Sequence, residues 1–228
     1  MTVFFYALKR YFRKPSNIVF LFILPVAAVF LPEGEWLPIP LGYQYYGVLL
    51  LLISARLTSI LLDDRANRIH LRMAAAPVTH FQYLFQNLLA YSLLLIVVTA
   101  VFVAAGVLYH GAGLPAPGLL FIVYTLCSIT SIGFCLAWYS LFQNREAAFH
   151  ILGGLIIIIA MLGGMMWPVE IMPEMLQRLV MLLPTYWMAE GVILAALDAP
   201  IRELILPLGM MGLFSTAFLL VGSRRRMA

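Results

Sequence analysis

Long uncharged apolar segments alternate with short polar or proline-broken segments along the whole chain. A helix that crosses a bilayer needs about 20 apolar residues, and runs close to that length recur here. The pattern predicts an all-α membrane protein with one transmembrane domain over residues 1–228. Its six transmembrane helices are expected at 16–31, 43–62, 81–109, 118–142, 149–167 and 204–222.

A different periodicity precedes the first predicted span. Between Val3 and Phe12 the apolar residues recur at helical spacing, which predicts an amphipathic helix over 2–14 that lies in the membrane interface. Pro15 ends this helix. The opposite face of the helix is cationic and consists of Lys9, Arg10, Arg13 and Lys14.

The region after the fifth predicted span is too polar to cross a bilayer and too apolar for an ordinary loop. Segment 185–198 would form only ~21 Å of helix against a ~30 Å hydrocarbon core. Irregular backbone is tolerated at membrane depth only when it is buried in protein or lines a cavity. We therefore expect 168–198 to form short re-entrant helices, an outer cap. Its prolines and glutamates are Pro168, Glu170, Pro173, Glu174, Pro184 and Glu190.

The charges orient the predicted spans. With six spans, every Lys and Arg except Arg178 and Arg202 falls on or near one side of the membrane. The positive-inside tendency makes that side cytoplasmic, and both termini lie there. Glu190, inside the outer cap, has two interpretations. It pairs with Arg178 or caps a re-entrant turn, or it takes part in proton coupling.

Composition excludes several classes of function. The chain is 64 % hydrophobic and 11 % charged, against about 25 % charged in average proteins, so it is not a soluble globular domain. The basic residues are scattered among apolar spans, so no nucleic-acid partner is predicted. The four histidines are dispersed without ligand spacing, so no metal site is predicted. Cys127 and Cys135 are separated by ~12 Å of helical rise, beyond the reach of a disulfide.

No catalytic motif is present. The chain has only the lysines Lys9 and Lys14, followed by Arg10 and Pro15, so it contains no G-x-x-x-x-G-K-[ST] phosphate-binding loop. An intramembrane protease is a six-span alternative, but no G-x-S-x-G occurs. The chain is therefore predicted not to be an enzyme, and any ATP-driven process must draw on another polypeptide.

The cytoplasmic loop between the second and third predicted spans combines opposite charges with a small-residue stretch and a proline. Its ordered features are Asp64-Arg65, Leu71-Arg72 and Ala76-Pro77-Val78-Thr79. The outer segment reads Gly163-Gly164-Met165-Met166-Trp167-Pro168, then Met172-Pro173-Glu174, then Pro184-Thr185-Tyr186-Trp187. In order and spacing these motifs resemble the ABC-2-type transporter permeases, the membrane subunits of bacterial ATP-driven exporters. Without that resemblance, the loop could also be a solvated segment that only enforces topology.

The resemblance implies a homodimer in the bacterial plasma (inner) membrane that binds two copies of an ABC ATPase. ATP and Mg would be held by the ATPase, and no cofactor by this chain. The loop over 63–80 would couple the two proteins. Ala66 and Arg68 stand where the family usually has glutamate and glycine, so Asp63 or Asp64 is expected to meet the ATPase. The expected coupling residues are Lys9, Arg10, Arg13, Asp63, Asp64, Arg65, Arg68 and Arg72.

By the same resemblance, the first, second and fifth spans line a substrate path at the dimer axis. Its expected residues are Tyr46, Leu49, Ile53, Arg56, Ile157, Met161 and Met165. Arg56 either snorkels toward lipid headgroups or faces a wet cavity. The methionines of this region either pack a core or form an adaptable apolar surface. The expected cargo is a hydrophobic or amphipathic drug, antibiotic or peptide. Alternatives are export of a lipid-linked glycan and a non-transporting membrane scaffold.

Overall fold

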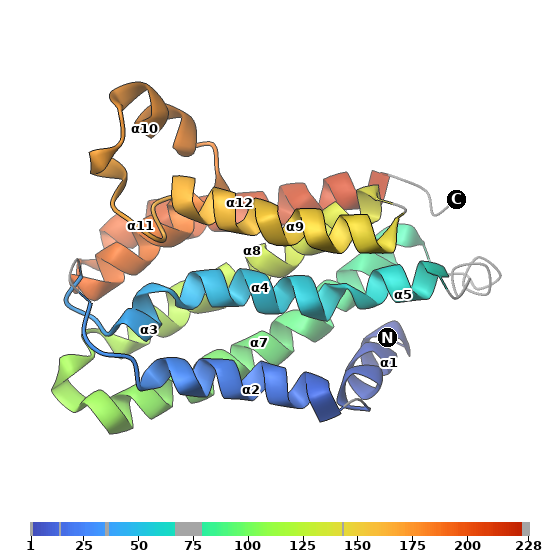
Figure 1. Ribbon diagram of the computed structural model, residues 1–228, viewed down its shortest axis with the longest axis horizontal. Helices are drawn as coiled ribbons and strands as arrows, with labels where there is room; N and C mark the ends of the chain where they lie inside the picture. Colours follow the sequence, from blue (N-terminus) through green and yellow to red (C-terminus); the bar gives the residue numbers. More distant parts are fainter. Residues whose placement is uncertain (1, 14, 35–36, 67–78, 143, 225–228) are drawn as a thin grey trace.

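The structure, a computed structural model, describes residues 2–13, 15–34, 37–66, 79–142 and 144–224. Within these ranges every regular element is helical, and Figure 1 shows the long helices lying side by side in an elongated bundle. The α-helices are α1 (Thr2–Phe12), α2 (Pro15–Val29), α3 (Leu41–Gln44), α4 (Tyr46–Thr58), α5 (Ile60–Ala66), α7 (His80–His110), α8 (Pro117–Leu141), α9 (Arg145–Leu162), α10 (Glu174–Val180), α11 (Pro184–Ala196) and α12 (Ile201–Arg224). The short 3-10 helices are η1 (Gly111–Gly113) and η2 (Val169–Ile171).

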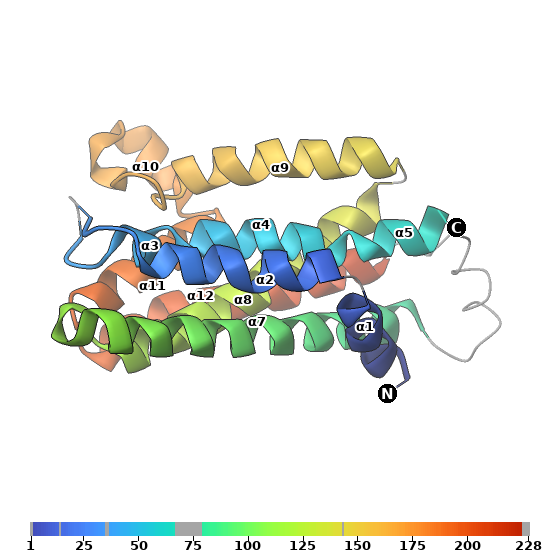
Figure 2. The ribbon, with the colours of Figure 1, turned by 60° about the horizontal axis from the view of Figure 1, so that its bottom comes forward.

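The two ends of the bundle carry different elements. α1, α5 and the C-terminal end of α12 lie at one end, here named the α5 end (Figures 1 and 2). η1 and α10 lie at the opposite end, named the α10 end. The long helices α2, α4, α7, α8, α9 and α12 run alternately from one end to the other. The predicted coupling elements therefore gather at one end, and the predicted outer cap lies at the other.

Four helical segments are long and apolar enough to cross a membrane: Tyr46–Asp63, α7, α8 and α12. α10 and α11 meet at 96° and together could make a fifth crossing as a broken span. α2 has 15 residues and α9 has 18, which gives ~22 Å and ~27 Å of helix, less than a bilayer core requires. The structure is thus an all-helical protein with four or five candidate spans, and the count of six stays a prediction.

The helix starts follow from local sequence chemistry. Thr79 and Gln82 form a capping box at the start of α7, in which each side chain accepts a hydrogen bond from the other residue's backbone N–H. Pro117 occupies the first turn of α8, where its missing N–H costs nothing. Asn144 caps α9 by accepting a hydrogen bond from the Ala147 N–H at 3.2 Å.

Several boundaries differ from those predicted. The second span is divided into α3, α4 and α5 by breaks at Tyr45 and Ser59. The fifth span was expected over 149–167, but α9 ends at Leu162. Gly163 caps α9, and Gly164 has φ = +81°, a conformation that glycine adopts without steric cost and that stops the helix. The last helix begins at Ile201, three residues before the predicted 204.

A buried aromatic cluster joins α3 and α4 to α7 and α8. The ring of Phe102 stacks between those of Tyr43 and Tyr46, with ring centroids 4.3 and 4.0 Å away. The Tyr43 hydroxyl donates to the Phe102 carbonyl at 2.9 Å, and the Tyr124 hydroxyl donates to the Tyr43 carbonyl at 2.6 Å. A side chain at Gly106 would collide with the Tyr43 hydroxyl, so this glycine is what admits the ring. The cluster fixes the position of α4 within the bundle.

The N-terminal helix packs on protein along much of its apolar face. Ala7 and Tyr11 are buried, and the Phe4 N–H donates to the Gln86 side chain of α7 at 3.3 Å. Phe5, Tyr6 and Phe12 are exposed large side chains on the same helix. α1 therefore occupies the predicted segment, ending at Phe12, while its place in a membrane interface stays a prediction.

Candidate transport site and coupling surface

The predicted coupling elements α1 and α5 meet at the α5 end. The Arg10 guanidinium of α1 donates to the Ile60 carbonyl, the first residue of α5, at 3.2 Å. Lys9 is exposed on α1, Arg13 is exposed directly after it, and Asp63 is half-buried on α5. Asp64 and Arg65 belong to α5, whereas Arg68 and Arg72 lie outside the described residues. The two predicted coupling elements thus lie at the same end of the bundle and are joined by the hydrogen bond from Arg10.

Tyr11 and Arg56 continue from these elements toward the membrane-spanning part of the protein. Tyr11 is buried, and desolvation raises the pKa of its hydroxyl to about 12, an effect that the nearby positive charge of Arg56 on α4 opposes. The phenol therefore stays neutral at physiological pH.

Arg56 lines a cavity of about 360 Å³ at the α5 end. Ser59 and Leu62 line the same cavity from the α4–α5 side, and Glu146 and His150 from the first turns of α9. The Arg56 side chain is exposed rather than packed. Arg56 thus lines a cavity, and its two predicted roles, facing wet space or snorkelling to lipid, both stay predictions.

The predicted path residues fall into two groups. Leu49, Ile157 and Met161 are partly or well exposed along α4 and α9. Tyr46 and Ile53 are 0 % and 1 % exposed, because they pack inside the helix bundle. Since Tyr46 stacks on Phe102 of α7, its ring is part of the core of the chain. The resemblance assigned all these residues to one path, but neighbouring helices cover Tyr46 and Ile53.

The outer cap begins where α9 meets α11. Thr185, in the first turn of α11, is buried and donates to the Ile159 carbonyl of α9 at 2.6 Å. A Cβ at Gly163 would overlap the Thr185 side chain, so the glycine permits this close approach. The hydrogen bond fixes the start of α11 against the end of α9. Figure 1 shows α10 beyond this junction, away from the long helices.

Prolines start each short element of the cap. Pro168 is the N-cap residue of η2, Pro173 is the N-cap residue of α10, and Pro184 is the first residue of α11. Glu170 lies on η2, and Glu174 is exposed in the first turn of α10. The Gln177 amide donates to the Met172 carbonyl at 2.8 Å and to the Glu170 carbonyl at 3.3 Å, which holds η2 against α10.

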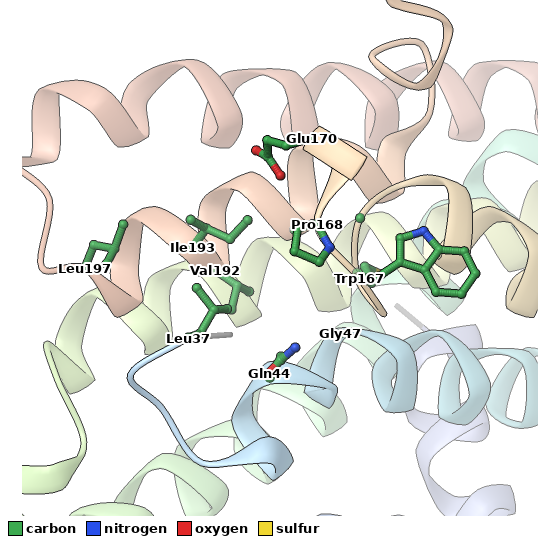
Figure 3. A pocket seen from close by; sticks show the side chains of 12 residues that line it. Leu37, Gln44, Gly47, Trp167, Pro168, Glu170, Val192, Ile193 and Leu197 are labelled. Carbon is green, nitrogen blue, oxygen red and sulfur yellow. The ribbon is translucent and has the colours of Figure 1, made fainter. Parts of the chain in front are cut away.

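A cavity of about 280 Å³ opens beneath η2 (Figure 3). Its walls come from the α3–α4 junction, from the link between α9 and η2, and from α11. The apolar wall residues include Leu37, Val192, Ile193 and Leu197, and the polar ones are Gln44, Trp167 and Glu170. Met165, 4 % exposed, closes the floor next to Gly47, where a Cβ would lie 2.6 Å from its terminal methyl.

A second, smaller cavity of about 90 Å³ adjoins the first, and the two share Gly164, Glu170, Ala189 and Ile193. Glu190, Gln177 and Tyr186 also line the smaller cavity. The charged group that acts on Glu190 is the Glu170 carboxylate, and no ion pair joins Glu190 to Arg178, both of which are described. The predicted pairing with Arg178 is therefore not formed, and Glu190 faces a cavity with like charge nearby.

Sequence reasoning missed several residues of the larger cavity. Leu37, Gln44 and Val192 were not singled out, and Trp167 was named only within the motif of the outer segment. Two of them had a signal in the sequence: the Gln44 amide and the Trp167 indole stand beside helix interruptions, where irregular backbone tends to line a cavity. Leu37 and Val192 have no such signal, because apolar residues are everywhere in this chain.

Comparison with known proteins agrees with this architecture. The sequence model of the ABC-2 family transporter protein matches residues 40–224, which contain every helix from α3 to α12. The chain therefore belongs to the ABC-2 transporter family, and it is the membrane permease component of an ABC transporter. The components described by this family generally do not carry the catalytic activity. None of the curated proteins compared with the chain matches it.

Proposed function

We propose that this protein is the permease subunit of an ABC exporter, which moves a hydrophobic or amphipathic drug, antibiotic or peptide outward across the bacterial plasma membrane. Membership of the ABC-2 family carries the proposal. The two lysines of the chain add support, because neither of them belongs to a phosphate-binding loop motif. The energy therefore comes from a separate ABC ATPase that binds ATP and Mg.

The α5 end offers the surface for that ATPase. α1 and α5 supply cationic and acidic residues side by side, and the Arg10–Ile60 hydrogen bond ties the two helices together. A surface of mixed sign can form charge-assisted hydrogen bonds with a soluble partner. A movement of α5 caused by the ATPase would displace α4 as well, because only Ser59 separates the two helices.

A second copy of the chain would complete the path. α9 presents a row of exposed isoleucines, Ile151, Ile157 and Ile158, and nothing lies within 4 Å of a Cβ added at Gly154. A helix face that combines large apolar residues with an open glycine suits close packing against another helix. In a homodimer of this kind, Leu49, Arg56 and Met161 would line the central passage along α4 and α9. Each protomer would bind one ATPase.

The proposed orientation places the α5 end in the cytoplasm and the α10 end outside. The basic residues of α1 and the Arg224 end of α12 lie at the α5 end, which supports this orientation. The outer cap would then close the passage on the outer side. The short helices η2 and α10 are suited to this role, because they are held by a few hydrogen bonds to neighbouring segments.

The function is tested by ATP hydrolysis in proteoliposomes that contain the permease and its ATPase. Addition of a lipophilic dye should stimulate hydrolysis by the wild-type complex. The double variant Asp64→Ala with Arg65→Ala should insert normally and lose the stimulation, because each lost charge-assisted hydrogen bond costs about 1.5–3 kcal/mol. That cost weakens docking about ten-fold or more.

The matched control removes a neighbouring pair of opposite charges at the other end of the bundle. Arg202→Ala with Glu203→Ala changes exposed residues in the first turn of α12 and should keep the stimulation. Stimulation at the wild-type level in the Asp64/Arg65 variant would reject the coupling role of α5. If no lipophilic dye stimulates ATP hydrolysis by the wild-type complex, the proposed cargo class is rejected.

A further inference from the structure

The larger outer cavity is both apolar and acidic. Leu37, Val192 and Leu197 supply apolar walls, and the Glu170 carboxylate stands above them from the opposite side (Figure 3). The volume of about 280 Å³ lies just below the range of roughly 300–1,000 Å³ typical of ligand pockets. The cavity is therefore large enough for a compact organic molecule with an apolar body.

The charge around the cavity has one sign. Among the described residues that line the two adjoining outer cavities, the charged side chains are Glu170 and Glu190, and none is Lys, Arg or His. Two carboxylates close to each other destabilise one another unless a cation lies between or beside them. Arg178, the basic residue of α10, does not line either cavity.

A further polar group of the larger cavity favours a ligand that can donate hydrogen bonds. Gln44 lines the opposite wall, and its buried Oε1 has no hydrogen-bond partner among the described residues. A buried acceptor without a partner costs about 1–3 kcal/mol. A half-turn of the amide would offer this oxygen to a donor in the cavity.

We propose that the cavity bounded by Gln44, Trp167, Glu170 and Val192 binds an amphipathic organic cation. The apolar body of the ligand lies against Leu37, Val192 and Leu197, and its positive charge lies beside the Glu170 carboxylate. The inference that the exporter's amphipathic cargo is a cation rests on the proposed function. The inference that the cavity binds such a cation concerns this chain alone.

The test is a binding measurement on the full-length permease in lipid nanodiscs without its ATPase. The probe is the fluorescent cation dimethylaminostyryl-methylpyridinium. Its neutral isostere, dimethylamino-methylstilbene, has carbon in place of the pyridinium nitrogen and so isolates the effect of charge. The wild-type permease should bind the cation more tightly than the isostere. Glu170→Gln should weaken cation binding about ten-fold, the effect of losing one charge-assisted contact, and leave isostere binding unchanged.

Two variants control this result. Glu174→Gln removes an exposed carboxylate four residues further on that lines neither cavity, and it should bind both probes as the wild type does. Leu197→Trp fills the mouth of the cavity from an exposed position and should weaken both probes. Equal cation affinity in the wild type and Glu170→Gln, or unchanged affinity in Leu197→Trp, would overturn the proposal. Either result would leave the ATPase complex intact, so failure of the cation site is distinguishable from failure of the transport function.

Discussion

A single methyl group at Gly163 tests how the outer cap is held on the bundle. A Cβ at this position would overlap the Thr185 hydroxyl, lie 2.6 Å from the Thr185 Cβ and lie 2.8 Å from the backbone carbon of the same residue. A rotation of the side chain relieves only the first of these contacts. The backbone carbon is part of α11, so Gly163→Ala requires α11 to move away from α9.

The cost can be estimated from two contributions. Overpacking of a well-packed site by one methyl group costs about 1–3 kcal/mol. Movement of α11 also lengthens the 2.6 Å hydrogen bond from Thr185 to the Ile159 carbonyl, worth about 0.5–1.5 kcal/mol. The sum is roughly 2–4 kcal/mol, which for a chain of this size lowers the unfolding midpoint by about 10 °C.

The assay is thermal unfolding of the purified permease in detergent, followed by tryptophan fluorescence. Gly209→Ala is the matched control, because nothing lies within 4 Å of a Cβ added there and the residue is inside α12. Alanine is favoured over glycine by about 0.5–1 kcal/mol inside a helix, so Gly209→Ala should keep or raise the midpoint. A Gly163→Ala midpoint within 2 °C of the wild type, on the order of the effect of 1 kcal/mol or less, would refute the packing argument.

Three further predictions concern topology, the cap and the core. A cysteine at Glu174 should react with an impermeant thiol reagent added outside intact cells, whereas one at Arg13 should react only after permeabilisation, and the reverse pattern would overturn the orientation. Replacement of both Pro173 and Pro184 by alanine should weaken transport but not ATPase binding, since helix starts in the cap would no longer be fixed; full transport would mean the cap is only a tether. Tyr124→Phe removes a buried 2.6 Å hydrogen bond to the backbone of α3 and should lower the unfolding midpoint by about 2–4 °C, whereas an unchanged midpoint would mean this bond adds no net stability.

The ends of most helices follow from residues that act locally. Thr79 with Gln82 starts α7, Pro117 starts α8 and Pro184 starts α11, and each effect depends only on neighbours in sequence. The end of α9 was harder to predict from the sequence, because Met165 and Met166 continue the apolar pattern beyond the last residue of the helix. The left-handed conformation of Gly164 stops α9 there, and hydropathy does not register it.

The candidate site was less accessible to sequence reasoning than the fold. In a soluble protein the apolar face of a helix marks the side that packs, but every face of a membrane helix is apolar. The sequence therefore placed Tyr46 and Ile53 with Leu49 and Arg56 on one path, although the first two are core residues. The outer cavity depends on contacts between Gln44, Trp167 and α11, which are far apart in sequence.

The central claim is that this chain is the membrane half of a transporter driven by a separate ATPase, and complex stoichiometry tests it most directly. The permease is expressed with a candidate ABC ATPase from the same genome, purified through a tag on the permease alone, and analysed by native mass spectrometry. The account predicts a complex of two permease chains and two ATPase chains, and its abundance should fall with the Asp64→Ala and Arg65→Ala double variant. A permease that purifies without any ATPase, under conditions that preserve its own fold, would contradict the account.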